Sequence, residues 1–494
     1  MIHSKKIQTI ELSHNQNEDL RSRAFGIYLE LLKKYRSDEL LLLESLGSNS
    51  IDSRVSLIGI CPTLTIAISD CIITFRGNEL LLEEIATLYV DEACSKSDIG
   101  VLEYQIANRK QIWDFIRKID HQFKLVQGGV LAFMTMAYQM IHYIEDLATY
   151  GADMPADITL TCFSACLEFG EQEVTLHDYD FIGAHSVSKA DLVEALIVND
   201  SHKMNSLSSK TLPSFTIECE TSREAYIEKA NRALHHIQIG DIYQVQIGQK
   251  VRINSTATPL EVYSRMRLLN PSPYMYLFNV QGRTVIGASP ELFVRVQDGE
   301  VLMRPIAGTL GKSATTTKAL AKTELQNNAK EVAEHLMLVD LCRNDLSRIA
   351  ISGSLTVLDL LDVEEYSHVY HMVTTSRVHM KGEFDKYDVI KACFPAGTMT
   401  GTPKIRAMEI IADLEDSDRG LYAGALGMIG LGTDFVNTAL CIRTAIECDG
   451  VYTLRASAGI VADSEADKEH AETLHKMGSV FKAITGEEIA CHLA

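Results

Sequence analysis

Apolar residues recur along the chain with two different periods, and each period predicts a different kind of element. Short apolar runs rich in β-branched residues are typical of strands, and they occur at 56–60, 63–68, 71–75, 274–280, 284–288, 292–296 and 301–307. In the segment 222–240 apolar residues lie three and four positions apart and the pattern ends at Gly240, which predicts an amphipathic helix. Longer helical patterns occupy about 317–348 and 465–486. Since strands and helices seldom alternate strictly, the pattern predicts an α+β fold.

One stretch interrupts these patterns. Residues 201–215 are rich in Ser, Asn, Thr and Lys, with one Pro, which is typical of a loop or linker. We therefore expect an N-terminal region at 1–205 and a C-terminal region at 216–494. A chain of 494 residues suits about two to three average domains, or one large fold built from two halves.

The longest uncharged run, 125–144, is long enough to cross a membrane. It contains Gln127, Gln139 and His142, so we interpret it as a buried strand followed by a helix. The N-terminal segment MIHSKKIQTIELSHNQNEDL lacks the apolar core of a signal peptide. We expect a cytoplasmic protein with no membrane partner.

The amino-acid composition of the chain limits the kinds of molecule that we expect it to bind. With 46% apolar and 23% charged residues, the chain has the make-up of a globular protein. The net charge of −20 would repel a phosphate backbone, so we expect no nucleic-acid partner. The 11 cysteines form no CxxC pair and no zinc-ligand cluster, which indicates reduced thiols in a core.

Two of the expected helices carry paired glutamates. Glu331 and Glu334 are three positions apart on one helix, and Glu469 and Glu472 repeat the spacing on another. Residues so spaced share a helix face, and two such faces would suit one Mg²⁺ ion, which prefers oxygen ligands. The alternative is that both are ordinary solvated faces.

Glycine-rich loops add a second signal. In 393–411, Gly397, Thr398 and Gly401 precede a helical run, which offers backbone N–H groups to an anion. Two further small-residue loops lie at 304–309 and 456–464. Each alone reads as a plain turn. Together with Arg443 and the glutamates they favour an enzyme that binds a small anionic substrate and a metal.

The second half, from about 220 to 487, resembles the chorismate-utilising enzyme family, and most closely the large aminating subunit of anthranilate synthase and its aminodeoxychorismate synthase relative. The resemblance rests on a series of motifs in the same order: GDIYQV, NPSPYMY, GASPELFVRV, RPIAGT, KEVAEHLMLVDLCRNDLSRI, YSHVYH, FPAGTMTGTPKIRAMEII, IRTA, AGIVADS and AETLHK. It implies a large α+β fold in which antiparallel sheets, flanked by helices, surround a deep active-site cleft. It also implies chorismate as the substrate and Mg²⁺ as the cofactor.

The motifs assign roles to individual residues. By resemblance, Glu334 and Glu472 match the metal ligands, with Glu331 and Glu469 as their outer partners. The matching positions that hold chorismate are Gly308, Thr309, Tyr422, Arg443, Ser457, Ala458, Gly459 and Lys476. The catalytic positions are Glu291, His371 and Thr398.

These residue types suit amination of chorismate. A protonated Glu291 would donate to the departing hydroxyl, which requires a raised pKa. Arg443 can hold a carboxylate with two hydrogen bonds, and His371 would serve later proton removal and pyruvate elimination. The alternative for His371, in the alternating context YSHVYH, is a hydrogen-bonded core histidine on a strand.

Two positions point to the nucleophile. Many aminodeoxychorismate synthases have a lysine where this chain has Ala307, and alanine cannot attack the ring. Isochorismate and salicylate synthases have a lysine where this chain has Gln244, which is not basic. The resemblance thus implies direct attack by ammonia. No cysteine lies in a glutamine amidotransferase motif, so we expect a separate glutaminase subunit to supply the ammonia.

LLLES and NPSPYM resemble the tryptophan-binding segments of feedback-regulated members. They imply L-tryptophan as an inhibitor, bound by Ser45, Pro273, Tyr274 and Met275 beside Glu44. The alternative is plain packing at the junction of the two halves.

Three departures from the family pattern bear on the product. Ser457 stands where the family usually has Gly, Gly248 where it usually has Ser, and Thr402 where it usually has Ala. We expect an anthranilate synthase large subunit, in tryptophan biosynthesis or a specialised-metabolism paralogue. The alternatives are an aminodeoxychorismate or aminodeoxyisochorismate synthase component, and a non-catalytic subunit that binds chorismate or tryptophan.

Overall fold

The computed structural model describes residues 2–10, 19–47, 55–90, 92, 94–147, 154, 156–183, 187–197, 212–313, 315–366 and 368–493. Of the region expected as a linker, 201–215, residues 201–211 lie outside the described residues. Strand β10 (Phe215–Cys219) begins at its end.

Strands and helices are mixed along the whole chain. The other strands of the first half are β1 (Ile2–Ile10), β2 (Leu40–Glu44), β3 (Ser56–Ser69), β4 (Ile72–Gly77), β5 (Cys94–Asp98), β6 (Val101–Gln105), β7 (Val130–Met136), β8 (Ile158–Phe169) and β9 (Val174–Phe181). Those of the second half are β11 (Gln244–Ser255), β12 (Tyr274–Val280), β13 (Arg283–Ser289), β14 (Leu292–Gln297), β15 (Glu300–Met303), β16 (Ile306–Gly311), β17 (Thr356–Glu365), β18 (Val369–His379), β19 (Gly401–Thr402), β20 (Ala425–Leu431), β21 (Val436–Leu440), β22 (Thr444–Cys448) and β23 (Val451–Ile460). The helices are α1 (Ala24–Leu31), α2 (Glu79–Leu88), α3 (Ile112–Gln122), α4 (Lys189–Ile197), α5 (Arg223–Gln238), α6 (Pro259–Leu269), α7 (Lys318–Asn327), α8 (Ala329–Ser347), α9 (Lys386–Cys393), α10 (Lys404–Leu414), α11 (Ala466–Thr485) and α12 (Ala490–Leu493).

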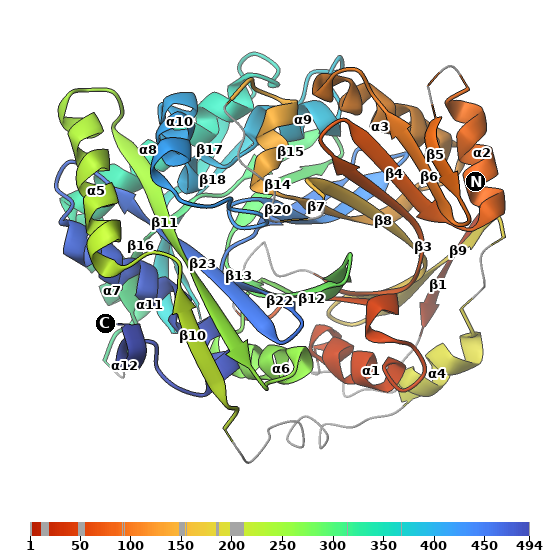
Figure 1. Ribbon diagram of the computed structural model, residues 1–494, viewed down its shortest axis with the longest axis horizontal. Helices are drawn as coiled ribbons and strands as arrows, with labels where there is room; N and C mark the ends of the chain where they lie inside the picture. Colours follow the sequence, from red (N-terminus) through yellow and green to blue (C-terminus); the bar gives the residue numbers. More distant parts are fainter. Residues whose placement is uncertain are drawn as a thin grey trace.

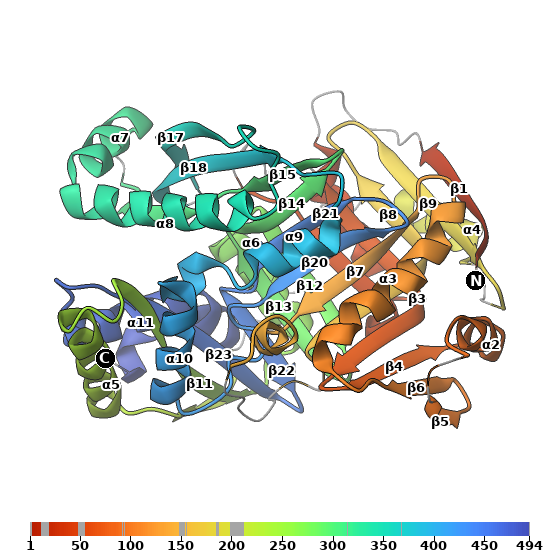
Figure 2. The same ribbon diagram turned by 90° about the horizontal axis from the view of Figure 1, so that it is seen from above.

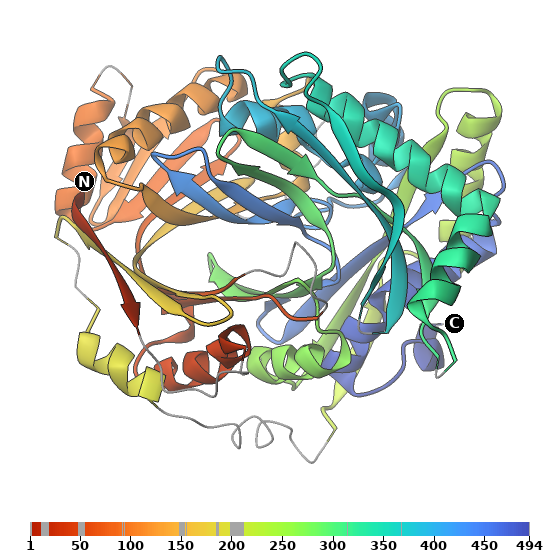
Figure 3. The ribbon, with the colours of Figure 1, turned by 180° about the vertical axis from the view of Figure 1, so that it is seen from behind.

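All described strand pairs are antiparallel, and they form two arms that start from the β3–β8 pair. One arm continues from β8 through β7, β20, β21, β14 and β15 to β18, which also pairs with β16 and β17. The other continues from β3 through β2, β12, β13, β22 and β23 to β11. Figures 1 and 3 show the arms as two layers of strands with helices on their outer sides. The α+β fold with antiparallel sheets and flanking helices is therefore confirmed.

The two halves of the chain share these layers. Strands of the first half pair with strands of the second twice, β7 with β20 and β2 with β12. Between the layers, the rings of Phe133 and Phe278 meet edge to face with centroids 4.6 Å apart. The buried ion pair of Lys386 with Asp120, 2.7 Å long, ties α9 to α3. Hydrogen bonding and packing are thus continuous across the boundary expected between the regions.

Most expected elements are present, with two corrections. The helical pattern at 317–348 forms two helices, α7 and α8, because Asn328 ends one and caps the next. The run 301–307 is split into β15 and β16, since Pro305 lacks the N–H that a continuous ladder needs. In 125–144 the expected buried strand and helix are present as β7 and a 3₁₀ helix (Tyr138–Tyr143). No helix among the described residues is long and apolar enough to span a membrane.

Candidate functional site

The two glutamate pairs lie on helices that belong to different parts of the sequence. The side chain of Asn328 accepts hydrogen bonds from the backbone N–H groups of Lys330 and Glu331, so α8 begins just before its glutamates. Helix α11 ends at Gly486, which adopts a left-handed φ of 81°. Figure 2 shows α8 and α11 on opposite sides of the same end of the molecule.

The four glutamates on these helices repel one another. Burial raises the pKa of Glu334, and the charges of Glu331 and Glu472 raise it further. Burial likewise raises the pKa of Glu331 and of Glu469, with Glu472 contributing to both. Glu472 forms an ion pair with Lys476 at 2.7 Å. The described part of the chain gives the other three no ion-pair partner, so the cluster carries excess negative charge.

A cluster of this kind suits a divalent cation. Within the described residues, no three His, Cys, Asp or Glu side chains come close enough to enclose an ion. Mg²⁺ usually takes one or two carboxylates and completes its octahedron with water and substrate oxygens. The carboxylate oxygens of these glutamates are donors of the type that Mg²⁺ prefers, with water and substrate oxygens needed to complete a site.

Glu291 lies in the loop between β13 and β14 and is 7% exposed. Burial raises the pKa of its carboxyl group to about 8, against opposing effects from Thr398, Lys476 and Arg443. The Thr398 hydroxyl lies beside this carboxyl, but its oxygen is buried with no hydrogen bond of good geometry among the described residues. A carboxyl group that stays protonated at neutral pH can act as a general acid.

Arg443 adjoins the same carboxyl group from the loop between β21 and β22. Its backbone φ is 52°, a conformation that a residue with a side chain adopts at a cost. Its guanidinium group forms no ion pair with any described residue, although the charges of Glu472 and Glu291 act on it. An unpaired, half-buried guanidinium group is well suited to a substrate carboxylate.

His371 is on β18, opposite Thr309 of β16. Its Nδ1 is 3.2 Å from the carbonyl oxygen of Gly308 and 3.1 Å from the Thr309 hydroxyl. Because a carbonyl oxygen only accepts, Nδ1 carries the hydrogen and Nε2 is free to accept a proton. Burial lowers the pKa of His371 to about 4, which keeps the ring neutral.

Gly308 allows this arrangement. It interrupts the β16–β18 register and has a φ of 69°. A Cβ atom there would lie 3.3 Å from Glu331 Oε2 and from Met372 Cε. The glycine thus permits both a left-handed turn and the approach of β16 to the glutamate helix.

Strand β23 carries Ser457, Ala458 and Gly459 side by side with β11. The Tyr422 hydroxyl donates a hydrogen bond to Ser457 Oγ at 2.9 Å, and Lys476 Nζ donates to the Ser457 carbonyl oxygen at 2.9 Å. A Cβ atom at Gly459 would lie 2.8 Å from Nε2 of Gln244. Gln244 Nε2 is in turn 3.5 Å from Glu334 Oε1.

These contacts bring the expected catalytic, substrate and metal residues into one cluster. Arg443 interacts electrostatically with Tyr422, Glu472 and Glu291, and Glu291 with Lys476. Strands β16, β18 and β23, helices α8 and α11, and three loops all contribute. Residues far apart in the sequence, such as Glu291 and Lys476, therefore act on one another electrostatically.

Comparison with known proteins identifies the family of this chain. A family model described as chorismate binding enzyme matches residues 82–482. The chain belongs to the chorismate binding enzyme family. It is an enzyme that acts on chorismate, and the match covers parts of both halves of the chain.

Its relatives divide between two activities. The chain is 41% identical to the 2-amino-4-deoxychorismate synthase of Streptomyces globisporus over 482 residues, 94% of this chain and 95% of that protein. It is 30% identical to the anthranilate synthase component 1 of Bacillus subtilis, over 92% of this chain and 89% of the other. The Aquifex aeolicus anthranilate synthase component 1 is 43% identical, but over 53% of each chain.

Solved structures support the fold of this chorismate-binding enzyme. Anthranilate synthase component I of Streptococcus pneumoniae has a TM-score of 0.65 at 28% identity, covering 88% of this chain and 93% of its own. The menaquinone-specific isochorismate synthase of Escherichia coli also has a TM-score of 0.65, over 97% of this chain and 94% of its own. At 16% identity, this second likeness concerns the fold alone.

The expected tryptophan residues lie where β2 meets β12. Glu44 and Met275 pair in register and are buried. Pro273 directly precedes Tyr274 at the start of β12, and the Ser45 hydroxyl donates a hydrogen bond to the Val55 carbonyl oxygen at 2.9 Å. The Glu44 carboxylate accepts hydrogen bonds from Arg267 at 2.7 and 2.9 Å and from Tyr263 at 2.6 Å. Glu44 is thus satisfied within the protein, and tryptophan binding stays a prediction.

Sequence reasoning missed a buried network beneath β11. Glu415 accepts hydrogen bonds from Arg419 at 2.8 Å, from Arg455 at 2.7 Å and from the Gly248 N–H at 2.8 Å. The two arginines lower the pKa of Glu415 to about 2. The i, i+4 spacing of Glu415 and Arg419 was the one available signal, and it marks surface pairs just as often.

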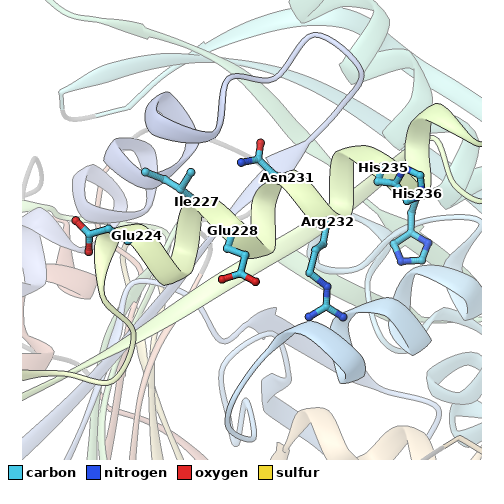
Figure 4. A pocket seen from close by; sticks show the side chains of 7 residues that line it. All are labelled: Glu224, Ile227, Glu228, Asn231, Arg232, His235 and His236. Atoms are coloured by element: carbon cyan, nitrogen blue, oxygen red, sulfur yellow. The ribbon is translucent and has the colours of Figure 1, made fainter.

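A separate hollow of about 520 Å³ lies along the outer face of α5. Figure 4 shows its lining side chains in a row on that helix, and none is an expected site residue. Arg232 pairs with Asp413 at 2.8 Å and His236 with Asp241 at 2.9 Å. We therefore assign the chemistry to the cluster around Glu291 and not to this hollow.

Proposed function

We propose that this enzyme aminates chorismate, with free ammonia as the nucleophile. The observation that carries the proposal is the Glu291 carboxyl group, buried beside Arg443 with a pKa raised to about 8. A carboxyl group that keeps its proton at neutral pH would serve as the proton donor for the departing hydroxyl. Neither Ala307 nor Gln244 can act as a nucleophile or activate water, which favours ammonia over a protein amine or water.

We assign substrate binding to charged side chains and backbone N–H groups of the cluster around Glu291. Arg443 would hold one carboxylate of chorismate. The backbone N–H groups near Ala458 and Gly459 would hold the other, where a side chain at Gly459 would collide with Gln244. Lys476, between Glu472 and the Ser457 carbonyl oxygen, would complete the binding site.

Glu334 and Glu472 would hold Mg²⁺, with Glu331 and Glu469 acting through water molecules. A bound Mg²⁺ would neutralise the ring carboxylate and withdraw electron density from the ring. The support for this is the excess negative charge of the four glutamates on α8 and α11.

The protein's own groups would carry the proton transfers. Ammonia would attack the carbon next to the ring carboxylate, the ring double bond would shift, and the C–O bond to the hydroxyl would break as Glu291 donates its proton, so that water leaves. The ammonium group formed by the attack would then lose one proton to give the amine and balance the proton that Glu291 donated. Thr398, beside the Glu291 carboxyl, would orient it. Neutral His371, with Nδ1 held by the Gly308 carbonyl oxygen, would present Nε2 as a base for the later removal of a ring proton.

Two products are candidates, and one observation favours each. An intact His371 base favours anthranilate with loss of pyruvate. The Ser457 hydroxyl beside Tyr422, together with similarity over nearly the whole chain to an aminodeoxychorismate synthase, favours an amino product that keeps the enolpyruvyl group. We expect the ammonia to come from a separate glutamine amidotransferase subunit, as is typical for component 1 relatives.

The test is incubation of the protein with chorismate, MgCl₂ and an ammonium salt, followed by product identification by liquid chromatography and mass spectrometry. Anthranilate differs from the aminodeoxy products both in mass and in ultraviolet absorbance. Glu291→Gln is the matched variant, since it keeps the size of the side chain and removes the proton donor. Unchanged chorismate with the wild type, or full activity in Glu291→Gln, contradicts the proposal.

A further inference from the structure

Two departures from the family pattern, Ser457 and Gly248, face each other in the structure. Gly248 of β11 and Ser457 of β23 are directly paired across the antiparallel ladder. A Cβ atom at position 248 would lie 2.7 Å from Ser457 Oγ. One side chain therefore fits in this space, and in this chain it comes from β23.

The Ser457 hydroxyl changes what Tyr422 presents to a ligand. Ser457 is 1% exposed, and its Oγ accepts the hydrogen bond of the Tyr422 hydroxyl at 2.9 Å. A tyrosine hydroxyl has one hydrogen to donate, so Tyr422 cannot at the same time donate to a substrate. The Ser457 hydroxyl keeps its own hydrogen, and no described residue accepts it.

Neighbouring contacts hold this pair in place. Lys476 Nζ binds the Ser457 carbonyl oxygen at 2.9 Å and also pairs with Glu472. On the other strand, the Gly248 N–H is held by Glu415 at 2.8 Å. Ser457 thus lies between the side chains assigned to the metal and those assigned to a carboxylate, with little freedom to move.

From these contacts we infer that Ser457 is a specificity-determining residue that retains the enolpyruvyl group on the aminated product. This inference rests on the proposed amination of chorismate. The Ser457 hydroxyl would donate a hydrogen bond to the enolpyruvyl carboxylate in addition to the contact from Arg443. A contact that stabilises the bound intermediate more than the transition state raises the barrier to the next step.

That next step is the elimination of pyruvate. A ring C–H bond breaks and its proton goes to a base, for which His371 is placed. The electron pair completes the aromatic ring as the C–O bond to the enolpyruvyl group breaks, with its pair remaining on oxygen. The released enolate takes up a proton and becomes pyruvate. Retaining the enolpyruvyl carboxylate at Ser457 slows this step and leaves the amination unaffected.

The test is the ratio of anthranilate to aminodeoxy product in the reaction with chorismate, Mg²⁺ and ammonium. We expect the wild type to form chiefly the aminodeoxy product. Ser457→Ala and Ser457→Gly should each raise the ratio about tenfold, the factor expected from losing one hydrogen bond. Gly248→Ser should raise it as well, because the new side chain displaces Ser457 Oγ from Tyr422.

Ser457→Ala separates hydrogen bonding from size, because it keeps the Cβ atom. Ser164→Ala is the matched control: Ser164 of β8 is also buried, and its hydroxyl contacts Thr63 at 2.7 Å, far along the chain from the cluster. It should leave the ratio unchanged. A purely structural effect would lower total turnover without moving the ratio.

The outcomes are distinguishable. A wild type that already forms only anthranilate, or a Ser457→Ala variant with the wild-type ratio, overturns the role of Ser457 but not the amination. A wild type that leaves chorismate unchanged overturns the proposed function instead. If Ser457→Gly folds poorly, Ser457→Ala and Gly248→Ser still decide the question.

Discussion

Two clusters of charged residues, one buried around Glu415 and one partly exposed on α8 and α11, differ in how their charges are balanced. Glu415 is surrounded by Arg419 and Arg455, and its pKa falls to about 2. The glutamates on α8 and α11 face one another, and the pKa values of Glu331, Glu334 and Glu469 are raised. Protein groups balance the charge of the first cluster, whereas the second cluster keeps an excess of negative charge.

The difference between the two clusters distinguishes charged residues that stabilise the fold from charged residues that serve the function. A buried ion pair whose partners are all protein groups holds the backbone, here the Gly248 N–H of β11. Carboxylates that raise one another's pKa persist at a cost in stability, and such costs concentrate at sites that bind a cation or perform chemistry. Substitutions in the two clusters should therefore fail in different ways.

The largest effect is expected from the unbalanced cluster. Glu334→Gln and Glu472→Gln should each abolish turnover, because each removes a charge that Mg²⁺ needs. The melting temperature should stay the same or rise, since repulsion is relieved. Chorismate consumption at rising Mg²⁺ concentrations and thermal unfolding measure the two effects. Near-full activity at modest Mg²⁺ would show that the altered glutamate is not a ligand.

The balanced cluster should respond in stability. Glu415→Gln leaves two arginines partly unpaired in the core and should cost about 3–5 kcal/mol of unfolding free energy. Because the folded pKa of Glu415 is lowered, its contribution is present above pH 4.5 and is lost as the pH falls toward about 2. Urea denaturation at pH 7 provides the measurement. Glu409→Gln on the exposed side of α10 is the control and should change stability by less than about 0.5 kcal/mol.

The pH dependence should follow Glu291. Its carboxyl group is protonated below about pH 8, so turnover should fall about tenfold per pH unit above that value. The raised pKa of Glu291 also determines how the free energy of unfolding changes with pH. The folded protein binds more protons than the unfolded chain between pH 4.5 and about 8, so stability falls as the pH rises through that window. Glu291→Gln should remove this fall, and an unchanged slope would place the raised pKa elsewhere.

The smallest effect concerns the β2–β12 junction, where Glu44 is already paired with Arg267. If the segment binds L-tryptophan, millimolar tryptophan should raise the melting temperature by about 1–3 °C through ligand linkage. Ser45→Phe should abolish the shift by filling the space. D-tryptophan is the control ligand. Absence of any shift in the wild type would exclude feedback binding here without affecting the catalytic proposal.

Local patterns were sufficient for much of the fold. The periodicity at 222–240 and 465–486 predicted α5 and α11, and the apolar runs predicted β12, β13 and β14 to within a residue or two. The errors came where single residues act on the backbone, as Asn328 does in starting a new helix and Pro305 in splitting a strand. The continuous sheet shared by both halves had no local signal, because strand pairing depends on distant partners.

The sequence by itself determined which chemical groups are present: four glutamates at helical spacing, a carboxyl group and an imidazole for proton transfer, an arginine, and no lysine at 307 or 244. Motif order was enough to place these residues in a family. Only the tertiary structure decided their protonation and pairing, because burial and neighbouring charges come from remote elements. It raised the pKa of Glu291, lowered that of His371, and left the Arg443 guanidinium group without an ion pair among the described residues. It also set Ser457 opposite Gly248, since the register of β11 with β23 is a property of the folded sheet and not of either segment.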